Sequence, residues 1–126
     1  MLIHLDTSVL IDAFTGPRRS LRVLRRATEA GEVTTFCTLV LYEWLRGPRS
    51  QPEREAVTEF FASDRLAPFG VQEGETAAAL YCQVKSARQR QADLAIAACA
   101  IEHGAKLWTL NDKDFADIPG LGLFRS

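Results

Sequence analysis

The pattern of apolar and polar positions predicts short strands that alternate with longer helices. The strands are short apolar or β-branched runs, and the second also contains an aromatic residue. Pro68 makes the third of them a candidate edge strand, because proline cannot donate a hydrogen bond to a neighbouring strand. We expect these strands at Leu2–Leu5, Val33–Cys37, Arg65–Val71, Lys106–Leu110 and Leu121–Phe124.

Helices are indicated by apolar spacing and by the residues that stop them. Gly-Pro pairs or single glycines follow four of the segments, Thr38 is placed to cap the third, and Pro52 suits a first turn. The polar stretch 86–91 is interpreted as a loop or a kink. We expect helices at Thr7–Phe14, Arg18–Ala30, Leu39–Arg46, Pro52–Ala62, Glu73–Arg88 and Ala92–Ile101. This alternation predicts an α/β fold with a mainly parallel central sheet of four to five strands, flanked by helices.

Composition fits one globular domain spanning residues 1–126. With 47% hydrophobic and 25% charged residues, the chain is neither a disordered segment nor a collagen-like repeat. Three widely spaced cysteines, with only His4 and His103 as further ligands, argue against a disulfide framework and a structural zinc; three buried thiols are expected. No signal peptide or apolar run of membrane-spanning length is found, which predicts a cytoplasmic protein.

Four acidic residues are placed to meet at one edge of the predicted sheet. Asp6 ends the first strand, Glu43 lies in the apolar helix after the second, Asp93 lies in the first turn of the alanine-rich helix, and Asp114 follows the fourth strand. Ligands of open parallel sheets bind at the carboxyl ends of the strands. Each acid also has a structural interpretation: Asp6 as a helix cap, Asp93 as a partner of the helix dipole, Asp114 as a turn residue. Glu43 among apolar residues is costly to bury without a partner.

Carboxylates that meet repel one another unless a cation joins them. An all-oxygen ligand set suits a hard ion, so we expect Mg²⁺, with Mn²⁺ as a second choice. Such an ion activates water and neutralises phosphate oxygens, which is the chemistry of phosphodiester hydrolysis.

The same residues resemble the motifs of PIN-domain ribonucleases. The segment Asp6-Thr7-Ser8-Val9-Leu10-Ile11-Asp12 resembles the first motif and Glu43-Trp44-Leu45-Arg46-Gly47 the second. The segment from Asp93 to Ala100 is similar to the third motif, and Thr109-Leu110-Asn111-Asp112-Lys113-Asp114-Phe115 to the fourth. The resemblance spans nearly the whole chain, whose size is that of the VapC-type toxins of bacterial toxin–antitoxin pairs.

This resemblance implies a Rossmann-like PIN domain that cleaves RNA endonucleolytically with Mg²⁺ or Mn²⁺. It also implies a homodimer and a cognate antitoxin that covers the site. By position, Asp6, Glu43 and Asp93 are the metal-binding and catalytic core, with Asp114 as the fourth acid. Thr7, Ser8, Asn111 and Asp112 are supporting residues, and whether Asp112 or Asp114 faces the metal stays open. The segment 88–92 lacks the proline that many relatives carry before the third motif.

Charge is compatible with an RNA substrate once the acids are assigned. Fifteen basic and sixteen acidic residues give a net charge of −1, but setting four acids aside leaves twelve against fifteen. Twelve of the basic residues are Arg, which suits planar phosphate contacts. Trp44, Trp108 and Tyr42 are expected in the core. One predicted helix carries the candidate RNA-binding residues Arg18, Arg22, Arg25 and Arg26. The alternative is that these arginines only form a solvated helix face.

Other functions are less well supported by these residues. A catalytically silent PIN-like module that binds RNA or protein is the main alternative, and the presence of all four acids argues against it. A phosphatase with an Asp nucleophile would need a second Asp where Ser8 stands. A phospho-receiver domain would need paired acids near the first strand.

Overall fold

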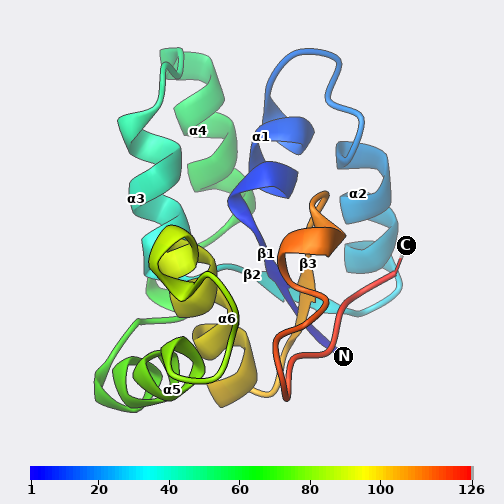
Figure 1. Ribbon diagram of the computed structural model, residues 1–126. Coiled ribbons are helices and arrows are strands. Elements are labelled where there is room, and N and C mark those ends of the chain that lie inside the picture. Colours follow the sequence, from blue (N-terminus) through cyan, green and yellow to red (C-terminus); the bar gives the residue numbers. More distant parts are fainter. Residues whose placement is uncertain (126) are drawn as a thin grey trace.

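Three parallel strands form the centre of the fold in the computed structural model, which describes residues 1–125 (Figure 1). Strand β1 (Leu2–Leu5) lies between β2 (Val33–Thr35) and β3 (Lys106–Trp108), in the order β2-β1-β3. Leu2 is paired with Val33, and His4 with Leu107. The prediction of an α/β fold with a parallel sheet is therefore confirmed.

The prediction of two further regular strands, at Arg65–Val71 and Leu121–Phe124, is wrong. Each is reduced to one parallel bridge, Cys37 with Ala67 and Leu107 with Leu123. Pro68 has no N–H to continue the first pairing, as its sequence position suggested. Within residues 1–125 the regular sheet thus has three strands, and one isolated bridge lies at each of its two edges.

The helices lie around the sheet in Figure 1, with α5 and α6 side by side and α1 packed against both α2 and α3. Single 3₁₀ turns cover Ser63–Arg65, Ala87–Arg90 and Asp112–Asp114. The helices are α1 (Thr7–Phe14), α2 (Leu21–Glu29), α3 (Thr38–Arg46), α4 (Gln51–Phe60), α5 (Val71–Tyr81) and α6 (Gln91–Glu102).

Several helix ends differ from prediction for local reasons. Helix α2 begins three residues late, because Arg18 has a left-handed backbone with φ of 55°. The N-cap of α3 is Cys37, whose sulfur accepts from the N–H of Leu39, while the Thr38 hydroxyl accepts from Phe69 instead. Helix α5 begins at Val71 and ends at Tyr81, well short of residue 88.

The core contains β1 and the small residues of α6, together with apolar side chains of α1, α2 and α3. Ala97, Ala98 and Ala100 are fully buried, as expected of a helix that packs closely on a sheet. Trp44 is fully buried, but Tyr42 is 61% exposed, so its predicted core position is wrong. Cys82 is likewise exposed rather than buried. No helix within residues 1–125 is long and apolar enough to span a membrane.

Candidate metal centre

Asp6 lies at the carboxyl end of β1 and is 5% exposed. Its backbone occupies the N-cap position of α1, but its side chain makes no capping hydrogen bond. Instead Oδ2 accepts from the hydroxyls of Ser8 and Thr109, each at 2.8 Å. Both bonds converge on one oxygen, which leaves Oδ1 without a hydrogen-bond partner among residues 1–125. The capping interpretation of Asp6 therefore fails, and its carboxylate is held in a fixed orientation.

Glu43 reaches the same region from α3. The Thr7 hydroxyl, in the first turn of α1, donates to Glu43 Oε1 at 2.5 Å. Arg46 Nη2, one turn further along α3, lies 3.7 Å from Oε2. Because α1 follows β1 directly, Thr7 ties Glu43 to the edge where Asp6 stands.

Asp93 shows that the carboxylates are close enough to interact. It lies in the first turn of α6, and its pKa is raised from 3.8 to about 6. Burial is the largest cause, followed by repulsion from Asp6, Asp114 and Glu43, while Arg90 opposes the rise. A carboxyl group surrounded by three others holds its proton more tightly. The carboxylates of Asp6, Glu43 and Asp114 therefore lie near enough to Asp93 to raise its pKa.

Asp112 and Asp114 lie in the same 3₁₀ turn after β3 but interact with different groups. Asp112 forms an ion pair with Arg125, whereas Asp114 adds to the repulsion on Asp93. Arg90 fixes this turn, donating to the Asp114 carbonyl oxygen at 2.8 Å and to both carboxylate oxygens of Asp117. Of the two, Asp114 is therefore the acid that lies near Asp93.

Only some of the predicted supporting residues contact the acids through their side chains. Thr7 and Ser8 contact the acids directly, as described, whereas Asn111 contributes its backbone N–H to the Thr109 hydroxyl at 3.0 Å. Thr109 itself was not predicted, and neither was Arg90. The signal for Thr109 was its position directly after the last strand, matching Asp6 after the first.

The four arginines do not join the acidic cluster. Arg18, Arg22, Arg25 and Arg26 are exposed and, with Leu21 and Glu29, line a shallow hollow of about 370 Å³. None forms an ion pair with a carboxylate within residues 1–125. They constitute a separate basic surface on and before α2.

The donor set fits a hard divalent cation. It consists of carboxylate oxygens without sulfur or imidazole, which is the chemistry that Mg²⁺ and Mn²⁺ prefer. Burial is the largest cause of the raised pKa of Asp93, and the repulsion from the other acids that adds to it is what such a cation would relieve.

Comparison with known proteins identifies the family. The family model described as PIN domain matches residues 3–121. Among solved structures, VapBC from Salmonella typhimurium bound to DNA is 25% identical, covers 98% of both chains, and has a TM-score of 0.75. VapBC2 from Rickettsia felis, bound to a DNA fragment from the promoter, is 22% identical over 98% of both chains, with a TM-score of 0.77. A toxin–antitoxin complex from Klebsiella pneumoniae is 24% identical over 96% of this chain and 95% of that one, with a TM-score of 0.73. No curated protein matches.

Proposed function

The chain belongs to the PIN domain family, and from this we propose that it is a Mg²⁺- or Mn²⁺-dependent endoribonuclease acting as a VapC-type toxin. The observation that carries the proposal is that Asp6, Glu43 and Asp114 lie near Asp93, whose pKa is raised to about 6 by burial and by their repulsion. The similar solved structures are toxin–antitoxin complexes, which supports the toxin assignment.

Each residue has a task that follows from its contacts. Asp6, Glu43, Asp93 and Asp114 would hold the cation, which lowers the pKa of bound water and neutralises a phosphate oxygen. Ser8 and Thr109 orient Asp6, and Thr7 orients Glu43. Thr7 and Asp93 lie in the first turns of α1 and α6. The free backbone N–H groups at these two helix ends therefore add positive electrostatic potential near the acids, which favours a phosphate.

A cognate antitoxin is the proposed protein partner. Tyr42 and Leu45 are 61% and 44% exposed, and they flank Glu43 on α3. Leu110, 51% exposed, follows Thr109 on the other side of the site. Exposed apolar side chains around a charged site suit a partner that covers it. We propose further that the toxin is a homodimer and acts in the cytoplasm.

The proposal is tested by incubating the purified chain with end-labelled RNA and with single-stranded DNA of the same sequence. We expect internal cleavage of RNA with Mg²⁺ or Mn²⁺ and none with EDTA. Binding of RNA without cleavage at any metal concentration would favour the silent PIN-like module. Cleavage of DNA alone would contradict the assigned substrate.

The toxin role is tested by co-expression with the neighbouring open reading frame. We expect arrested growth on expression of this chain alone and relief when a small partner protein co-purifies with it. Sedimentation equilibrium of the isolated chain measures the proposed dimer.

A further inference from the structure

A second group of metal-ligating side chains lies outside the acidic cluster. His4 lies in the central strand β1, Cys99 lies in the last turn-and-a-half of α6, and His103 is the C-cap residue directly after α6. One ligand atom from each of the three residues lies within 4.8 Å of the others. Asp93 lies six residues before Cys99 on the same helix, which is about 9 Å along the axis. This His/Cys cluster is therefore distinct from the four carboxylates.

The buried and unpaired side chain of His4 is the observation that indicates a bound ligand. Its side chain is 1% exposed, and neither Nδ1 nor Nε2 has a hydrogen-bond partner among the residues described. A buried imidazole must carry at least one N–H, and leaving that donor and the opposite acceptor unpaired is costly. The side chains that form the cluster with it are those of His103, whose ring centre is 5.6 Å away, and Cys99.

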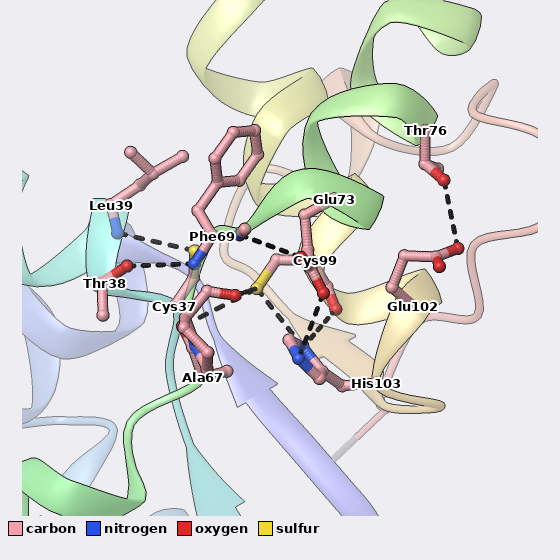
Figure 2. Close-up of polar contacts among 12 residues, drawn as sticks. Cys37, Thr38, Leu39, Ala67, Phe69, Glu73, Thr76, Cys99, Glu102 and His103 are labelled. Carbon is pink, nitrogen blue, oxygen red and sulfur yellow. Dashed lines mark hydrogen bonds and ion pairs between the residues drawn. The ribbon is translucent and has the colours of Figure 1, made fainter.

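The spacing of Cys99 and His103 matches that of two ligands on one ion. Cys99 Sγ and His103 Nδ1 are 3.4 Å apart, and Figure 2 shows the sulfur and the ring pointing toward each other. Two ligands at the usual Zn–S and Zn–N lengths in a tetrahedral site are separated by about 3.5 Å. The i, i+4 spacing on α6 gives this arrangement without any change in the helix.

Glu73 supplies the outer partner that a metal-bound histidine usually has. It is 8% exposed, and its Oε2 lies 3.3 Å from His103 Nε2 (Figure 2). Its other oxygen accepts from the Gly70 N–H at the start of α5, which fixes the carboxylate. A carboxylate that receives the second N–H of a histidine orients the ring toward a metal.

We propose that His4, Cys99 and His103 form a binding site for Zn²⁺ or a similar transition-metal ion, with Glu73 positioning His103. The sulfur and imidazole donors select this class of ion over the Mg²⁺ expected at the carboxylates. Binding releases the Cys99 thiol proton, and the proton of the neutral His103 ring moves from Nδ1, where it is donated to the Cys99 carbonyl oxygen at 2.8 Å, to Nε2, which faces Glu73. The ion would tie the end of α6, the helix that carries Asp93, to β1, the strand that Asp6 directly follows.

Cobalt titration of the full chain tests the site, because thiolate-bound Co²⁺ has a charge-transfer absorption that carboxylate-bound Co²⁺ lacks. We expect one Co²⁺ per chain with this absorption, displaced by Zn²⁺, and a melting temperature raised by Zn²⁺. Cys82→Ser, which changes an exposed cysteine, is the matched control and keeps all three properties. Cys99→Ser loses the charge-transfer absorption.

His103→Gln keeps the test decisive if the buried Cys99 variant does not fold, since His103 is partly exposed. We expect its zinc affinity to fall by more than about tenfold. Absence of the thiolate absorption in the wild-type chain, or its persistence in Cys99→Ser, would overturn the proposal. Asp6→Asn keeps the absorption whether or not the chain is a nuclease, so the two proposals fail independently.

Discussion

Replacing Asp93 by asparagine is expected to stabilise the metal-free protein at neutral pH. The pKa of Asp93 is raised from 3.8 to about 6 in the folded state, so folding favours the protonated carboxyl group. That stabilisation is fully present below the unfolded pKa near 4 and is lost as the pH rises through 6. The asparagine side chain cannot ionise, so the variant keeps its stability where the wild-type chain loses it.

The size of the effect follows from the two pKa values. A difference of about two pKa units corresponds to roughly 3 kcal/mol, and we take half because the side chain is partly exposed. For a chain of 126 residues, about 1.5 kcal/mol raises the melting temperature by roughly 5–6 °C.

Thermal unfolding followed by circular dichroism in EDTA measures this difference. We expect Asp93→Asn to melt above the wild type at pH 8 and at the same temperature at pH 3, below the unfolded pKa. With Mg²⁺ at about 100 times its Kd, the wild type gains about 2.7 kcal/mol, and the variant gains far less. Asp64→Asn, which changes an exposed carboxylate remote from the cluster, is the control and follows the wild type. A variant less stable than the wild type at pH 8 in EDTA would refute the reasoning.

Three further variants probe two residues beside the acids and the separate basic surface of α2. Thr7→Val removes the hydroxyl that orients Glu43, and we expect a Kd for Mn²⁺ about fivefold weaker by calorimetry; an unchanged Kd would argue against this role. Arg90→Gln removes a positive charge near Asp93, so the pKa of Asp93 should rise further in an NMR titration, and a fall would contradict the electrostatic account. Arg22→Glu with Arg26→Glu should weaken RNA binding and flatten its dependence on salt; if neither changes, the arginines are a solvated helix face.

Local sequence signals predicted the parts of the fold that local chemistry determines. Helix α1 ends where the Gly16-Pro17 pair predicts, and Pro52 lies in the first turn of α4 as expected. The expected strand 65–71 could not be judged from composition, because pairing depends on what lies beside it: only Ala67 bridges to Cys37. The early start expected for α2 failed because the backbone of Arg18 is left-handed, which its side chain does not signal.

The acidic cluster was predictable because each acid follows a strand or opens a helix at one edge. Its supports were less so: Thr109 contacts Asp6 across 103 positions in sequence, and only the sheet brings them together. Sequence spacing argued against a zinc site at the His/Cys cluster, because it does not show which residues the fold brings together. His4 is remote in the chain from Cys99, yet the i, i+4 pair Cys99 and His103 was visible on the predicted helix or just beyond its end.

Cleavage of labelled RNA by Asp6→Asn, compared with the wild-type chain and Asp64→Asn prepared in parallel, tests the central claim most directly. Asp6 is held by two hydroxyl groups and lies near enough to Asp93 to raise its pKa, so loss of its charge should remove metal binding while the fold persists. We expect Mg²⁺-dependent cleavage by the wild type and Asp64→Asn, and a rate for Asp6→Asn lower by about 100-fold or more. Equal cleavage by all three proteins would contradict the assignment of the acidic cluster as a catalytic metal centre.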